Sequence, residues 1–151
     1  MDENGPLSAE REPRQARAED ELSLEIPDEV LAAVPEFQSN AEAVVVVDFQ
    51  GVVLGMNEAA EELFKMSSED IAGEFVEMLV PTKKRWGHQA YRRGYLAEPR
   101  DREMDPGLYP EAETADGEIV PLKGRLQPVR VDGRLFVAAH MTRDVDPRPD
   151  A

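Results

Sequence analysis

The sequence predicts an α+β domain built on an antiparallel sheet, and three observations support this prediction. A run of β-branched residues at 44–47 is followed by the turn DFQG and a second apolar run, which is typical of a β-hairpin. Helix-forming segments then occupy residues 57–96. The last third of the chain returns to apolar stretches joined by the turn signals ADG and VDG. Hairpins separated by helices favour the α+β class.

Composition excludes several kinds of protein. The 151 residues suit one domain with a tail, and the net charge of -15 argues against direct contact with nucleic acid, which requires a basic face. The absence of cysteine excludes disulfides, zinc–thiolate sites and a cysteine nucleophile. No apolar run reaches the roughly 20 residues of a membrane span. The first ten residues, MDENGPLSAE, lack signal-peptide features, so we expect a soluble, cytoplasmic protein.

The N-terminal part divides into two segments. Residues 1–21 form an acidic leader with almost no large apolar side chains, so we expect this segment to be disordered. Residues 22–39 predict a flanking helix that starts at Pro27 or Asp28 and is limited by Pro35. Its apolar face consists of Val30, Leu31 and Val34.

Residues 40–146 contain the predicted domain. Its first hairpin joins residues 44–47 to residues 52–56 through the turn at 48–51. Asn57 is expected to cap the next helix, NEAAEELFKM, because an asparagine side chain accepts hydrogen bonds from the free N–H groups of the first turn. The buried stripe of that helix is predicted to be Ala59, Ala60, Leu63 and Phe64.

Two more helices and the final strands follow. Ser67 is expected to open a short helix that ends at Gly73. After the apolar segment EFVEMLVP, a longer helix is predicted at residues 83–96. A polar connection at residues 97–110 leads to strands around ADG and VDG, and the most apolar of them is the last, RLFVAAHMT. Residues 147–151 are a tail.

The order of these elements resembles a PAS domain over residues 40–146. The resemblance implies a five-stranded antiparallel sheet with helices on one side and a ligand cavity between them. It also implies sensing of small molecules, redox state or light, and dimerisation, with the flanking helix packed between subunits. The residues that carry it are Asp48, Gly51, Asn57, Ala59, Ala60, Leu63, Phe64, Gly73, Leu79, Pro81, Asp116, Gly117, Arg143 and Asp144.

The segment LVPTKKRWGHQAYRRGYL also resembles a helix of the haem-binding PAS domains of bacterial oxygen-sensor kinases. That resemblance implies His88 as the axial iron ligand, with Tyr91 and Tyr95 on the same helical face. It also places Arg92, together with Arg93, near the haem propionates. The arginine that contacts bound oxygen in those sensors has no counterpart, and Leu108 stands nearest to its position. The alternative is a histidine that packs between helix and sheet.

His140 is the second histidine of the chain. On the last predicted strand it shares a face with Phe136 and Ala138, but either face can be the cavity side. If His140 points inward, both histidines line one pocket. The candidate cofactor-binding residues are therefore His88, Tyr91, Arg92, Tyr95 and His140, and a metal is expected at His88 only with haem. Two histidines alone are weak evidence for a metal site.

Other cofactors have less support. A flavin–cysteine adduct and a thioester-linked chromophore both need a cysteine, which the chain lacks. Flavin held without a covalent bond stays open, although no flavin-specific motif is present. The cofactor is otherwise unassigned.

The basic residues gather between positions 83 and 102. Their match to the acidic residues 1–36 suggests charge pairing within the chain or between subunits. The members of this cluster are Lys83, Lys84, Arg85, Arg92, Arg93, Arg100 and Arg102.

No nucleotide-binding, metalloprotease or hydrolase motif is present, so we do not expect an enzyme. We predict a PAS-type sensory or interaction domain of signal transduction. It is expected to form a homodimer and to relay a small-molecule or redox signal to a partner protein or a fused output domain. Two alternatives remain: a haem-bound gas or redox sensor with His88 as axial ligand, and a ligand-free dimerisation scaffold in a transcription regulator.

Overall fold

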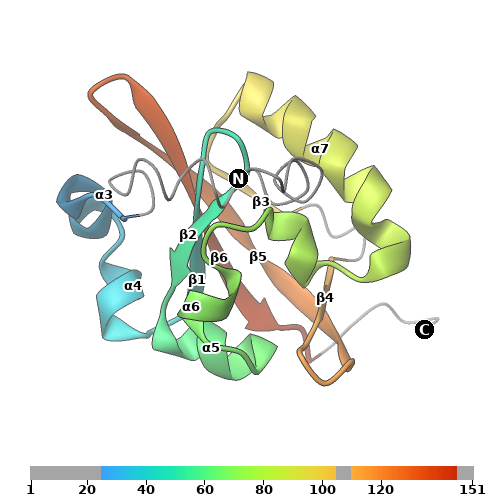
Figure 1. Cartoon of the computed structure of the whole chain (residues 1–151). Helices are drawn as coiled ribbons and strands as arrows, with labels where there is room; N and C mark the ends of the chain where they lie inside the picture. Colours follow the sequence, from blue (N-terminus) through green and yellow to red (C-terminus); the bar gives the residue numbers. More distant parts are fainter. Residues whose placement is uncertain (1–24, 105–109, 146–151) are drawn as a thin grey trace, which may run out of the picture.

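The computed structural model describes residues 25–104 and 110–145. The predicted acidic leader, Leu108 and the C-terminal tail lie outside these ranges. Figure 1 shows a twisted sheet with helices on both of its faces. No helix in the described ranges is both long enough and apolar enough to cross a membrane.

The predicted antiparallel sheet is confirmed. Its strands follow the order β2-β1-β6-β5-β3, and β4 also pairs with β5. A five-stranded sheet was expected. The structure has six strands, because two short strands, β3 and β4, both pair with the outer edge of the long strand β5. The strands are β1 (Ala43–Asp48), β2 (Val53–Met56), β3 (Arg102–Glu103), β4 (Glu111–Glu113), β5 (Ile119–Val131) and β6 (Arg134–Arg143).

Local chemistry explains two of the predicted turns. The Asp48 carboxylate accepts hydrogen bonds from the backbone N–H groups of Gln50 and Val52, at 2.9 and 3.0 Å, which closes the β1–β2 turn. At the tip of the β5–β6 hairpin, Asp132 and Gly133 both have positive φ angles, 51° and 81°. Two adjacent left-handed residues match the twist of a tight hairpin, for which the sequence VDG is suited.

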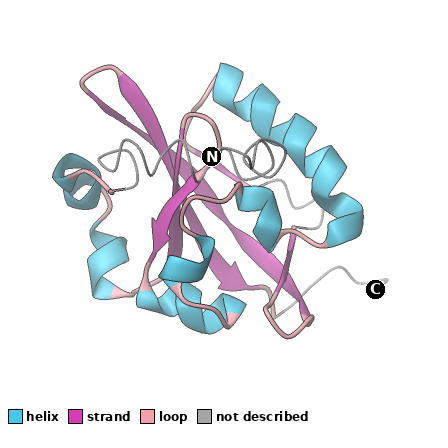
Figure 2. Cartoon of the chain, viewed as in Figure 1, coloured by secondary structure: helices cyan, strands magenta, loops and turns pink. Residues whose placement is uncertain are grey.

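Helices of the inner face run from β2 to β3 (Figure 2). Asn57 caps α5 and Ser67 caps α6 through a capping box, both as predicted. The long helix begins at Arg85, two residues later than expected, because the preceding residues form a 3-10 turn. The elements are α5 (Glu58–Phe64), α6 (Ser68–Ile71), η2 (Val76–Leu79), η3 (Thr82–Lys84) and α7 (Arg85–Ala97).

The outer face of the sheet carries two helices where one was predicted. Pro35 does not only end α3 (Asp28–Ala33); it also opens α4 (Pro35–Ser39), where the fixed φ angle of proline suits the first helical position. Val30 and Val34 are fully buried in an apolar cluster with outward-facing residues of the sheet. The flanking segment therefore covers the sheet of its own chain. The predicted arrangement, with helices on one side of the sheet, therefore holds for residues 40–146. The helices on the other side, α3 and α4, precede that range.

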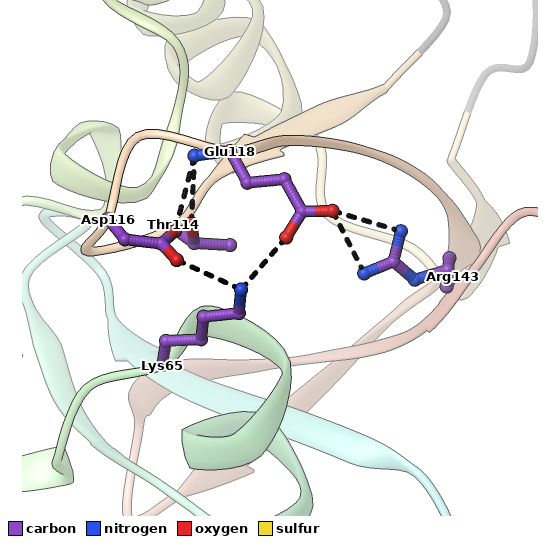
Figure 3. A network of polar contacts seen from close by, with 5 residues as sticks. All are labelled: Lys65, Thr114, Asp116, Glu118 and Arg143. Carbon is purple, nitrogen blue, oxygen red and sulfur yellow. Dashed lines mark hydrogen bonds and ion pairs between the residues drawn. The ribbon is translucent and has the colours of Figure 1, made fainter.

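A polar network ties together three elements at one end of the sheet (Figure 3). Lys65, just after α5, donates to Asp116 and Glu118, each at 3.0 Å, and Glu118 also pairs with Arg143 of β6 at 3.5 Å. Hydrogen bonds from Thr114, and then from Lys65, lower the pKa of Asp116 to about 2. These contacts are exposed, so they position the β4–β5 turn more than they stabilise the fold.

Candidate functional site

A cavity of about 450 Å³ lies between the inner face of the sheet and α7. Its lining is mostly apolar, because the strand alternation turns the odd-numbered residues of β1 and β6 toward the helices. The strand residues that line it are Val45, Val47, Ala112, Leu122, Leu126, Val137, Ala139 and Met141. The helical side contributes Phe64, Val76, Leu79, Gly87, His88, Tyr91, Arg92, Tyr95 and Leu96.

Small side chains help to keep this space open. Ala112 of β4 and Ala139 of β6 occupy positions where a larger inward-facing residue would fill part of the volume. Four basic side chains and one acid also line the cavity: Lys83, Lys84, His88, Arg92 and Glu111. Lys84 pairs with Glu111 at 3.0 Å, so this part of the lining is largely neutralised.

Glu77 of η2 holds two residues of α7 in place. The Nδ1 of His88 lies 2.6 Å from Oε2 of Glu77. The Arg92 guanidinium donates from Nε to Oε2 at 2.9 Å and from Nη2 to Oε1 at 3.0 Å. A further bond of 2.8 Å joins Nη1 of Arg92 to the backbone oxygen of Gln50. The network thus connects η2, α7 and the β1–β2 turn.

The charge of Glu77 depends on these partners. Burial disfavours the ionised carboxylate, but hydrogen bonds from His88 and Arg92 outweigh it and lower the pKa of Glu77 from its ordinary 4.5 to about 2. Since the pKa is lower in the folded state, the stabilisation is complete above about pH 4.5. It is lost as the pH falls toward 2.

We therefore expect a Glu77→Gln variant to be less stable than the wild type by a margin that depends on pH. The difference in the free energy of unfolding should be largest above pH 4.5 and should shrink as Glu77 becomes protonated. Urea unfolding of both proteins at a series of pH values measures this margin. A difference that stays constant down to pH 2.5 would contradict the assigned network.

The two tyrosines of α7 have different environments. The Tyr95 hydroxyl donates to the backbone oxygen of Arg100 at 2.6 Å, and burial raises the pKa of Tyr95. The Tyr91 hydroxyl is also buried, but it meets no hydrogen-bond partner within residues 25–104 and 110–145. The Arg102 guanidinium lies 5.9 Å from the centre of the Tyr91 ring. Tyr91 is thus a side chain of the cavity wall with an unused polar group.

His140 does not line the cavity. It pairs with Val44 in the sheet and points to the outer face, where it is 1 % exposed. The interpretation in which both histidines share one pocket is therefore wrong, and they cannot share a metal across the sheet. The outward parity of Phe136 and Ala138 places His140 beside the flanking helices instead.

Members of the predicted basic cluster are engaged by other groups of the domain. Arg85 donates to the backbone oxygen of Val80 at 2.8 Å, while Arg92 is engaged by Glu77 and Gln50. The predicted pairing with the leader falls mostly outside the described residues. Sequence reasoning missed Glu77, although a lone acid inside the apolar segment EFVEMLVP was a visible signal.

The haem-type arrangement fits this site in part. His88 lines the cavity, and its Nδ1 contacts a carboxylate, which is how proteins often orient a metal-binding imidazole through its other nitrogen. Arg92, however, is bound on three sides by Glu77 and Gln50, so its guanidinium is not free for propionates. The exposed Arg93 does not line the cavity.

Comparison with known proteins agrees with this architecture. The family described as "PAS fold" matches residues 36–143. A PAS domain from Colwellia psychrerythraea is 17 % identical, with a TM-score of 0.63 over 76 % of this chain and 96 % of its own. The PAS domain of an HTR-like protein from Haloarcula marismortui is 14 % identical, with a TM-score of 0.60 over 87 % and 98 %.

A third similar structure carries a ligand. It is the PAS domain of the RpfR quorum-sensing receptor from Cronobacter turicensis, in complex with C12:0. It is 14 % identical to this chain, with a TM-score of 0.52 over 68 % of this chain and 92 % of its own. At such identities the three structures establish the fold alone.

Proposed function

The chain belongs to the PAS family, and on that premise we propose that it is a sensory domain whose cavity binds a small, mostly apolar molecule with an anionic end. The observation that supports this most is the cavity of about 450 Å³ beside α7. Its volume lies within the roughly 300–1,000 Å³ typical of ligand pockets, which are also apolar with a few polar groups.

The polar groups of the wall indicate which end of a ligand they would meet. Lys84 is paired with Glu111, and Arg92 is paired with Glu77. Lys83 and the buried hydroxyl of Tyr91 are left as the groups best able to contact a ligand. A cation and a hydroxyl favour a carboxylate or similar anion over an ammonium group. The C12:0 complex of the Cronobacter turicensis receptor is in keeping with this chemistry.

Signal transfer would start at α7. A ligand that displaces this helix would also change the contacts of His88 and Arg92 with Glu77. Through Arg92 the displacement would reach the β1–β2 turn. Such a change is a shift between two packings of helix and sheet, biased by the ligand. The receiver in this proposal is a protein: a second copy of the chain, a separate partner or a fused output domain.

Binding of dodecanoate, an apolar chain with a carboxylate end, tests the proposal. We expect Ala139→Leu to weaken binding at least tenfold, since the added carbons occupy the cavity. Ala90→Leu, the same change at an exposed position of α7, should leave the affinity unchanged. Isothermal titration calorimetry on the full chain measures both. Equal binding by the two variants, or none by the wild type, would refute a dodecanoate-like ligand in this cavity.

A second candidate is a haem-bound sensor, favoured by the contact between His88 and Glu77 at the cavity wall. Haem would supply gas binding or electron transfer at its iron, with His88 as the protein ligand. The absorption spectrum of the purified protein, with and without added haemin, discriminates between the candidates. A Soret band that disappears in His88→Ala supports haem. A purified protein that is colourless and also fails to take up added haemin excludes it.

A further inference from the structure

Arg92 is a largely buried cation in the wall of the ligand cavity, and Glu77 neutralises it. Nε of Arg92 donates to Oε1 and Oε2 of Glu77 at 3.2 and 2.9 Å, and Nη2 donates to Oε1 at 3.0 Å. Arg92 lines the cavity, whereas Glu77 is not one of the lining residues. Because arginine keeps its charge in proteins, the pairing does not depend on titration of Arg92.

Contacts other than Glu77 also fix the Arg92 guanidinium. Its Nη1 donates to the backbone oxygen of Gln50 at 2.8 Å, and its central carbon lies 5.6 Å from the centre of the Phe75 ring. Gly51 makes room for it, since a Cβ atom on that residue would overlap the guanidinium. These contacts hold the cation in place independently of the carboxylate, which makes it a preorganised anion site.

Glu77 is held less firmly than Arg92. It lies on η2, a 3-10 helix of four residues, whose hydrogen bonds have poorer geometry than those of the longer α7. Burial disfavours its ionised form, and the pairing with Arg92 and His88 compensates for that. The adjacent Met78 is exposed, so water is close to this turn. A Glu77 carboxylate that lost Arg92 would therefore turn toward solvent.

We propose that the anionic end of a cavity ligand replaces Glu77 at the Arg92 guanidinium, so that Glu77 is an internal competitor of the ligand. This inference rests on the proposed function and adds how the anionic end is recognised. A ligand carboxylate offers the same two oxygens as the one it displaces, so the guanidinium fork stays filled. A neutral alcohol offers no charge and leaves Glu77 in place.

The exchange would separate occupancy of the cavity from a signal. Val76 and Leu79 of η2 line the cavity, and the bonds of Glu77 to α7 hold η2 against that helix. An anionic ligand breaks the bonds to Arg92 and frees η2. A neutral ligand of the same length fills the cavity without this change.

Glu77→Gln tests the competition, because glutamine keeps the shape of the side chain but leaves the charge of Arg92 unneutralised. We expect the variant to bind dodecanoate at least about tenfold more tightly than the wild type. Its affinity for dodecanol, the same chain with a neutral end, should not change. Glu98→Gln, an equal charge change at an exposed position after α7, should match the wild type with both ligands.

Isothermal titration calorimetry on the full chain, with protein titrated into ligand, gives the four comparisons. The readout is the ratio of the dodecanoate and dodecanol affinities, because a loosened fold would change both affinities alike. The wild type supplies a second measurement that does not require Glu77→Gln to fold. In protein labelled with ¹³C and ¹⁵N, dodecanoate should shift the Glu77 carboxyl signal and the Arg92 Nε–H signal, and dodecanol should shift neither.

Two outcomes would overturn this inference and leave the proposed function standing. One is a dodecanoate-to-dodecanol affinity ratio in Glu77→Gln that equals or falls below that of the wild type. The other is a wild type saturated with dodecanoate in which the Glu77 and Arg92 signals stay in place. Failure of both proteins to bind either ligand would instead refute the proposed function, and this inference with it.

Discussion

Gly124→Ala is expected to lower the free energy of unfolding by about 3 kcal/mol or more. Gly124 of β5 pairs with Met141 of β6. A Cβ atom at this position would lie 1.8 Å from the backbone oxygen of His140. Because that neighbour is backbone, the two central strands must separate to make room, which disrupts the sheet at the level of the cavity.

Gly94→Ala is the matched control for this substitution. Among residues 25–104 and 110–145, no atom apart from its chain neighbours and the backbone of its own helix lies within 4 Å of the position that its Cβ would take, and the residue is exposed on α7. Alanine is the better helix former, so stability should rise by up to about 1 kcal/mol. Urea unfolding of both variants measures the contrast. A Gly124→Ala protein as stable as the wild type would show that β5 and β6 are not so close.

Asn57→Ala is expected to lower the free energy of unfolding by about 2–4 kcal/mol. The Asn57 Oδ1 accepts from the backbone N–H groups of Val44 and Ala60, at 2.9 and 3.0 Å. Its Nδ2 donates to the backbone oxygens of Glu36 and Glu42, at 3.3 and 2.7 Å. Alanine removes the helix cap, worth about 1 kcal/mol, and leaves the buried N–H group of Val44 unsatisfied, at about 1–3 kcal/mol.

Ser67→Ala separates the cost of losing a helix cap from the cost of leaving a buried group unsatisfied. Ser67 caps α6 through a capping box but is exposed. Within the part of the chain that the structure describes, its side chain bonds only locally, to the backbone N–H of Asp70. Its loss should cost about 1 kcal/mol, the ordinary value for a cap. Chemical unfolding of both variants, compared with the wild type, gives the two values. Equal losses would mean that the contacts of Asn57 with Val44, Glu36 and Glu42 contribute nothing.

Features that depend on neighbouring residues could be predicted from the sequence. The caps at Asn57 and Ser67 and the turns at 48–51 and 131–133 are each decided by side chains within a few positions. The division of the flanking helix at Pro35 was harder to predict, because a proline can end one helix or begin another.

The side of the sheet that a strand residue faces could not be predicted for His140. Alternation separates two sets of residues but does not say which set meets the helices until the neighbouring strands are placed. The contact of Glu77 with His88 and Arg92 joins residues 11 and 15 positions apart in different elements. The cavity exists because the side chains of several strands and helices together do not fill the space between sheet and helices. A local sequence pattern cannot predict this.

The proposed role of the cavity beside α7 is to receive an apolar ligand with an anionic end. Titration of the ¹⁵N-labelled chain with dodecanoate, followed by amide chemical shifts, tests it most directly. We expect shifts at Val45, Val137 and Tyr91, which line the cavity, while the amides of α3 and α4 stay unshifted. Shifts confined to the surface around Trp86, which is 84 % exposed, would contradict it.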